Sequence, residues 1–302
     1  MKNECRKALL ITIAVDTSSA KGKGKYVPNF NGGFRGPFWG KGEEFEYIPI
    51  PETMMGQRSD KKWEWKGKYV EGGKATYKTA LGNRSKTNIL TYVPAELRAN
   101  LEHAAIHYDP DFKNLTYGDG KKETPRGKQL AKLNPGDLLV FCPSLENPET
   151  REPDRGRFII GSFTVECAYD FTNAEFEKRF KCTRSDVVEK YKNKNAHFSE
   201  EFARAWDCSR KELLESYDDK EEADLVLVAG IEKESGLFEN AIRITRPHDG
   251  KYFVMPKDLV GDLGLKKPPG PLKYERGWKW VKGDQYLRNL HNLLKKGGDF
   301  VK

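Results

Sequence analysis

The segment from His103 to Asp119 gathers residue types that carry out acid–base or metal chemistry: two histidines, three aspartates and two tyrosines. If His107, Asp109 and Asp111 lie on one extended strand, they share a face, because side chains alternate along a strand. This imidazole and these carboxylates would then bind a divalent metal such as Mg, Mn or Fe, or supply a general acid or base. The alternative is that Asp109 and Asp111 form a turn around Pro110 and bond to local backbone amides.

Residues outside this segment are candidates for the same site. Asp16 ends the apolar run 8–15, which predicts a buried strand, and polar site groups gather at strand ends in sheet proteins. His197 precedes a helix that Ser199 is predicted to cap, so the loop before it can fold over the sheet. Asp119 is a further candidate ligand, although its sequence context also fits a turn. The predicted catalytic residues are His107, Asp109, Asp111, Asp16 and His197.

A second candidate region, residues 20–42, interleaves lysine and arginine with aromatic residues. Aromatic rings offer stacking faces to unpaired bases, and cations meet phosphates. The residues predicted to contact nucleic acid are Lys23, Lys25, Phe34, Arg35, Phe38 and Trp39. The alternative is a long loop packed by its own aromatic rings. Neither G-x-x-x-x-G-K-[ST] nor G-x-G-x-x-G occurs here, so no phosphate loop is predicted.

The composition predicts a globular protein with a preference for polyanions. Among 302 residues, 53 Lys and Arg against 45 Asp and Glu give a net charge of +8, although a charge-rich surface alone gives the same count. Five cysteines without a C-x-x-C pair argue against a zinc ribbon. The odd count and the absence of a signal-peptide pattern favour a cytoplasmic location. The apolar run 8–15 is too short to span a membrane.

Hydrophobic patterns predict an α+β fold with a mixed, mostly antiparallel sheet. Apolar runs at 138–142 and 158–168 predict two adjacent antiparallel strands joined by a polar, exposed loop. Because a Pro-Gly-Asp turn precedes the first of them, this order is similar to small PUA-like barrels, as a fold-level analogy. Residues 224–231 predict a buried strand followed by a turn, a short helix and a strand. Leucines at helical spacing predict a terminal helix over 285–296.

Residues 172–220 switch to helical signals and are predicted to be a helical insertion. Thr172-x-x-Glu175 and Ser209-x-x-Glu212 match the capping box, in which two side chains bond reciprocally to backbone amides. No internal repeat and no low-complexity linker divides the chain. We therefore predict a single domain over residues 1–302 that contains this insertion.

Several short motifs follow one another in a fixed order along residues 8–282. They are a first strand ending in Asp16, Gly32-Gly33, the IPIP element at 48–51, His107-x-Asp109-Pro110-Asp111, Tyr117-Gly118-Asp119, Pro135-Gly136-Asp137, Gly161, Asn195-x-His197 and the block from Gly230 to Ala241 with Ser235-x-Leu237-Phe238. This order resembles the third type of nucleotide-modification-associated domain, a poorly characterised family found beside DNA-modification genes of phages and microbes. The resemblance implies a role near modified bases and supplies no established reaction.

We therefore predict a protein of nucleic-acid or nucleotide modification that acts on or recognises modified bases. As an enzyme it would use the histidines and aspartates above, with a divalent metal as a possible cofactor. As a non-catalytic reader it would grip an extruded or single-stranded base through the aromatic and basic residues. A third alternative is a structural subunit of a modification system. In each case a nucleic acid or nucleotide is the expected partner, and no membrane is expected.

Overall fold

The protein is described here from a computed structural model. It describes residues 7–13, 34–40, 42–47, 50–51, 70–71, 74–75, 81–82, 106–122, 124–147, 151–205, 208–248, 252–265, 272–273 and 278–301. The predicted catalytic residue Asp16 and the predicted nucleic-acid contacts Lys23 and Lys25 lie outside these residues.

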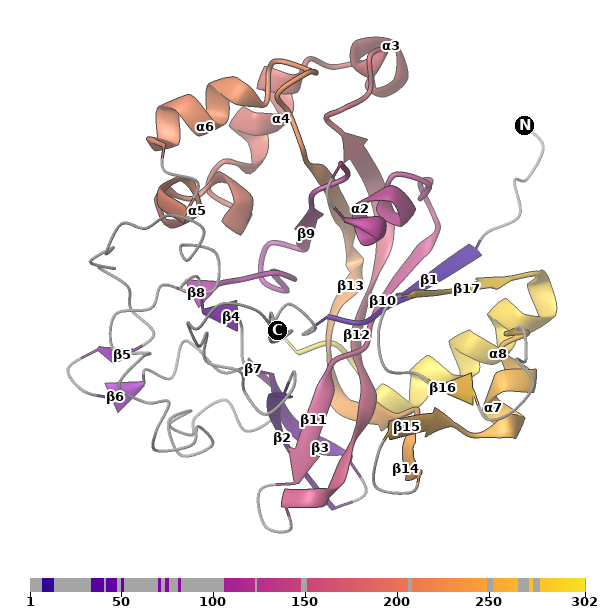
Figure 1. Cartoon of the computed structure of the whole chain (residues 1–302). Coiled ribbons are helices and arrows are strands. Elements are labelled where there is room, and N and C mark those ends of the chain that lie inside the picture. The colour runs from indigo at the N-terminus through magenta and orange to yellow at the C-terminus, as the bar shows by residue number, and fades with distance from the viewer. Residues whose placement is uncertain are drawn as a thin grey trace.

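A ten-stranded sheet forms the centre of the fold (Figure 1). Its order is β17-β1-β10-β12-β11-β2-β3-β7, while β13 pairs with β12 and β9 pairs with β13. The strands are β1 (Lys7–Ile11), β2 (Phe34–Trp39), β3 (Glu44–Tyr47), β7 (Leu81–Gly82), β9 (Thr116–Asp119), β10 (Leu138–Phe141), β11 (Ser144–Asn147), β12 (Arg151–Asp170), β13 (Val226–Arg243) and β17 (Trp278–Lys282). Among the described pairs, β1–β10 and β11–β2 are parallel and the others are antiparallel. The predicted α+β class with a mixed, mostly antiparallel sheet is confirmed.

Three small sheets complete the described strands. They are β4 (Ile50–Pro51) with β8 (Ile106–His107), β5 (Val70–Glu71) with β6 (Lys74–Ala75), and β14 (Arg246–His248) with β15 (Tyr252–Met255) and β16 (Leu272–Lys273). The first of them matters most for function, because β8 leads directly into the segment that contains Asp109 and Asp111.

β12 and β13 form a long antiparallel ribbon that local patterns predict only in part. The predicted exposed loop before residue 158 is wrong, because β11 lies within it and Leu145 is fully buried in the core. The turn and helix predicted after residue 231 are also wrong, since β13 continues to Arg243 and pairs there with Phe158 of β12. Pairing between distant segments overrides the local turn signals at both places.

The described helices lie outside the sheet and cover it. They are α2 (Pro125–Leu130), α3 (Phe176–Phe180), α4 (Arg184–Tyr191), the 3-10 helix η6 (Ala196–Phe198), α5 (Glu200–Ala205), α6 (Arg210–Ser216), α7 (Lys257–Asp262), α8 (Asp284–Leu294) and the 3-10 helix η7 (Lys295–Gly297). Figure 1 shows α3 to α6 together at one end of the β12–β13 ribbon, and α7 with α8 on another side of the sheet. None of the helices that the structure describes is long and apolar enough to cross a membrane.

One of the two predicted capping boxes is confirmed. Ser209 Oγ accepts from the Glu212 N–H (3.2 Å), and the Glu212 carboxylate accepts from the Ser209 N–H (2.7 Å), as predicted for α6. The box predicted at Thr172 is wrong, because its hydroxyl donates to Asp170 (2.7 Å) and α3 begins without a side-chain cap. A buried carboxylate two residues earlier competes successfully for this hydroxyl.

The core consists of three apolar clusters, and β1 contributes to two of them. Leu9 and Ile11 belong to the cluster on the α2 side of the sheet, whereas Ala8 and Leu10 belong to the cluster beneath α7 and α8. Alternate side chains of a strand point to opposite faces, so covering both faces requires a continuous apolar run. The third cluster packs α3 to α6 against the adjoining ends of β12 and β13.

Candidate functional site

Gly118 of β9 holds Asp109, one of the predicted site residues, in place. Its N–H donates to Asp109 Oδ1 (2.9 Å), and the Asp109 side chain comes from the segment that follows β8. Asp109 is only 8% exposed, and its backbone carbonyl accepts from the hydroxyl of Tyr47 in β3 (3.4 Å). A backbone amide and a core tyrosine therefore fix this carboxylate beside β9.

His197 reaches the same glycine from η6, far along the chain. A Cβ atom added to Gly118 would lie 2.5 Å from His197 Nδ1, closer than real Cβ contacts. The imidazole also packs against the ring of Phe202, with ring centroids 4.7 Å apart. Gly118 thus contacts both Asp109 and His197, and only a residue without a side chain lets the imidazole lie this close.

Asn195 bonds to the His197 imidazole and to β9. Asn195 Oδ1 lies 3.0 Å from the backbone N–H of His197 and 3.0 Å from His197 Nδ1. Asn195 Nδ2 lies 3.0 Å from Thr116 Oγ1, and the Thr116 hydroxyl donates to the backbone carbonyl of Lys194 (2.6 Å). All of these groups are buried or partly buried, and buried polar groups need hydrogen-bond partners. Each donor in this network must therefore face an acceptor.

The network fixes which imidazole nitrogen carries the proton. Because Thr116 uses its only proton on the Lys194 carbonyl, it must accept from Asn195, which therefore presents its NH₂ group there. Its oxygen then faces His197, where the backbone N–H also requires an acceptor. Nδ1 must accordingly be protonated to bond to the same oxygen. In the neutral imidazole, Nε2 is then the nitrogen that can accept a proton.

Asp111 is as buried as Asp109, at 7% exposure, but its carboxylate bonds within its own turn. It accepts from the N–H groups of Lys113 and Asn114 (2.9 Å each) and from Asn114 Nδ2 (2.6 Å). Burial raises the pKa of Asp111, although these hydrogen bonds oppose the shift. Burial, together with the charge of Asp111, also raises the pKa of Tyr108 to about 12. The chain bends between Asp109 and Asp111, so the two acids do not share one extended strand.

Asp119 and Arg126 tie β9 to α2 and to the end of β1. Asp119 Oδ1 accepts from the Thr124 hydroxyl (2.8 Å), and Oδ2 accepts from Arg126 Nε (2.7 Å). Arg126 Nη1 also donates to the backbone carbonyl of Thr12 (3.2 Å). The sequence pattern did not anticipate Arg126, because a single arginine in a short helix carries no spacing signal.

His107 lies two residues before Asp109, at the end of β8. It pairs with Ile50 of β4, which places its backbone near the site. Among the residues whose surroundings the structure describes, no group of three His, Cys, Asp or Glu side chains could hold a metal. Binding of a divalent metal therefore stays a prediction.

The predicted nucleic-acid contacts that the structure describes belong to β2 rather than to a loop. Phe34, Arg35, Phe38 and Trp39 are all in this strand, which pairs with β11 and β3. The register sets Phe38 opposite the fully buried Phe45, and the half-buried Trp39 opposite the exposed Glu44. Contact between these residues and nucleic acid stays a prediction.

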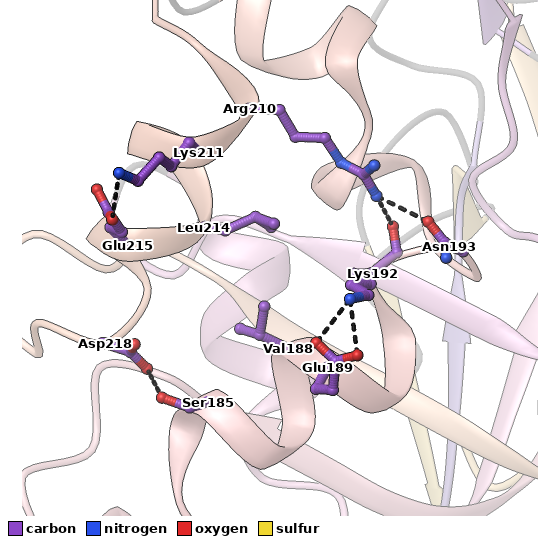
Figure 2. A pocket seen from close by; sticks show the side chains of 10 residues that line it. All are labelled: Ser185, Val188, Glu189, Lys192, Asn193, Arg210, Lys211, Leu214, Glu215 and Asp218. Carbon is purple, nitrogen blue, oxygen red and sulfur yellow. Dashed lines mark hydrogen bonds and ion pairs between the residues drawn. The ribbon is translucent and has the colours of Figure 1, made fainter.

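A pocket of about 620 Å³ lies between α4 and α6 (Figure 2). Each charged group drawn there bonds to another residue of the pocket lining. Lys192 pairs with Glu189 (2.6 Å), and Arg210 donates to the Lys192 carbonyl (2.5 Å) and to the Asn193 side chain (2.9 Å). No predicted site residue lines this pocket, and we do not assign the candidate site to it.

The fold is an α+β protein with a mixed sheet, in which the Asp109 carboxylate and the His197 imidazole each contact Gly118 of β9. A comparison with protein families matches residues 7–288 to nucleotide modification associated domain 3, and the chain belongs to this family. The resemblance seen in the sequence is thereby confirmed, and the family description associates the chain with nucleotide modification. No curated protein and no solved structure matches. The similarity to PUA-like barrels therefore stays a prediction.

Proposed function

We propose that the protein is an enzyme that acts on the base of a nucleotide or nucleic acid, with His197 as its general acid or base. The observation that carries this proposal is the Nδ1–H tautomer set by Asn195, which makes Nε2 the proton-accepting nitrogen. An enzyme that transfers protons needs an imidazole in one orientation and one tautomer.

Asp109 is the proposed partner of His197 in this site. A carboxylate close to an imidazole favours the charged imidazolium that forms when Nε2 takes up a proton. Both groups contact Gly118, although they are far apart in sequence. His107 and Asp16 stay in the proposal as predicted site residues, and Asp111 supports the turn that carries Asp109.

The test compares His197→Gln with His291→Gln, a matched change at an exposed histidine of α8. Each protein is incubated with DNA and with a panel of nucleotides, and the released nucleosides are analysed by mass spectrometry. His197→Gln is expected to lower turnover by about 10²–10⁴-fold and to leave nucleotide binding in place, whereas His291→Gln keeps full turnover.

Two results would overturn the proposal. The first is full turnover in the His197→Gln variant. The second is a wild-type protein that binds nucleotides but changes none of them, which would make the protein a reader rather than an enzyme.

A further inference from the structure

A tryptophan surrounded by lysines lies on the same side of the sheet as α2. Trp280 of β17 is half-buried, and its Nε1–H donates to Gln129 Oε1 in α2 (3.0 Å). Lys7 Nζ lies 5.3 Å and Lys282 Nζ 5.6 Å from the centroid of the indole ring. Lys132 Nζ donates to the same Gln129 oxygen (3.1 Å). We call Trp280, Lys7, Lys132 and Lys282 the Trp280 cluster.

The charge of the Trp280 cluster is only partly neutralised by neighbouring acids. Lys7 pairs with the buried Asp137 at 3.6 Å. Within the part of the chain that the structure describes, Lys132 and Lys282 have no carboxylate partner, and both are exposed. The one acid and three lysines leave a net charge of about +2 beside an aromatic ring, as expected of a surface that binds polyanions.

α2 connects the Trp280 cluster to the candidate active site. Gln129 contacts Trp280, while Arg126, one turn earlier in α2, bonds to Asp119 next to Gly118. Arg126 also bonds to Thr12 of the chain that continues β1, and Trp280 lies opposite Leu9 of β1. The three residues from Leu9 to Thr12 span about 10 Å along a strand. Through α2, these contacts link the Trp280 cluster to β9, the strand that carries Gly118.

We propose that the Trp280 cluster is a docking platform for single-stranded nucleic acid. An unpaired base stacks on the indole, displacing a lysine side chain that then meets a backbone phosphate. A single strand fits better than a duplex, because stacking on a half-buried ring requires a base that is free of its own stack. This inference rests on the proposed function and deepens it, since it makes a single strand the carrier of the base that reaches His197.

The test reverses the charge of Lys132 and Lys282, the two lysines without a carboxylate partner among the described residues. Binding of a fluorescent single-stranded DNA 12-mer is measured by anisotropy. Lys132→Glu/Lys282→Glu is expected to weaken binding at low salt on the order of 10- to 100-fold. The slope of log affinity against log salt should become shallower by about 1.4, which is 0.7 for each lost phosphate contact on a single strand. Trp280→Leu, checked for folding by near-ultraviolet circular dichroism, should weaken binding by about tenfold through lost stacking.

The control is Lys211→Glu/Lys257→Glu, which changes net charge equally at exposed lysines of α6 and α7. Equal loss in both double variants, no loss in either, or preference of the wild type for duplex DNA would each overturn the platform. His197→Gln should bind the 12-mer like the wild type. Normal binding by Lys132→Glu/Lys282→Glu with lost turnover in His197→Gln would refute the platform alone, and the reverse pattern would refute the catalytic proposal alone.

Discussion

Asp109 and Asp111 are two residues apart and equally buried, yet their carboxylates bond in different ways. Asp111 accepts only from groups two and three residues further along the chain in the hydrogen bonds described above. Asp109 accepts from Gly118 of β9, the residue against which His197 packs. The difference separates a carboxylate that holds its own turn from one that is bonded to a strand of the central sheet.

The distance in sequence to the bonded partner is what distinguishes the two acids. A carboxylate bonded to its own turn stabilises local backbone geometry, as Asx-turns do in many loops. A carboxylate bonded to a strand that a histidine from a distant helix also contacts requires the whole fold for its placement. Such long-range convergence of ionisable groups is the pattern that marks functional sites. Substitutions at and around the two acids should therefore separate activity from stability.

Gly118→Ala should have the largest effect, because the added Cβ would lie 2.5 Å from His197 Nδ1 and push the imidazole away. We expect turnover to fall on the order of 10²-fold or more and unfolding free energy to fall by about 1–3 kcal/mol. Gly261→Ala in α7 is the control, since a Cβ there meets nothing within 4 Å. Normal turnover in Gly118→Ala would remove His197 from the site.

Asn195→Ala should have an intermediate effect, because it removes the oxygen that bonds to Nδ1–H. Long-range ¹H–¹⁵N NMR of the His197 imidazole should show a single Nδ1–H tautomer in the wild type and a mixture in the variant. Loss of one hydrogen bond of about 1 kcal/mol predicts a decrease in turnover of up to about tenfold. A wild-type spectrum with Nε2 protonated and Nδ1 bare would contradict the assignment.

Asp111→Asn should have the smallest effect and should alter stability rather than turnover. Burial raises the folded-state pKa of Asp111, so its contribution to stability is present below the ordinary carboxyl pKa and is lost as pH rises through the raised value. The asparagine lacks this titration. The unfolding free energy of the variant minus that of the wild type should therefore increase across this pH window in urea titrations. A difference that stays constant with pH would contradict the expected sign.

The sequence predicts Asp109 and His197 as site residues but not the groups to which they bond. Asp109 is predicted from its spacing to His107 and Asp111, and His197 from its place before a predicted helix, while Asn195 belongs to the motif order that resembles the family. Thr116 and Arg126 were not identified, since their roles depend on contacts between segments that only the folded chain brings together. The same reason explains β13, whose pairing with β12 replaced the helix that local patterns predicted.

The fold was predicted where one element carried its own signal. β1 is apolar on both faces and α8 repeats leucine at helical spacing, so each pattern sufficed. The box at Ser209 also formed as its spacing required, whereas the box at Thr172 was lost to Asp170. A local pattern predicts the structure correctly where no other group competes for the same hydrogen-bonding atoms.

The hydrogen bonds from His197 through Asn195 and Thr116 run head to tail and end on a main-chain carbonyl, that of Lys194. Reversing one of them would require reversing all three, so the chain behaves as a single polarised unit. Its direction is therefore dictated by the path of the backbone at residue 194 and not by the side chain there. The protonation pattern of the imidazole can thus be inherited intact while residue 194 varies in charge, size and polarity.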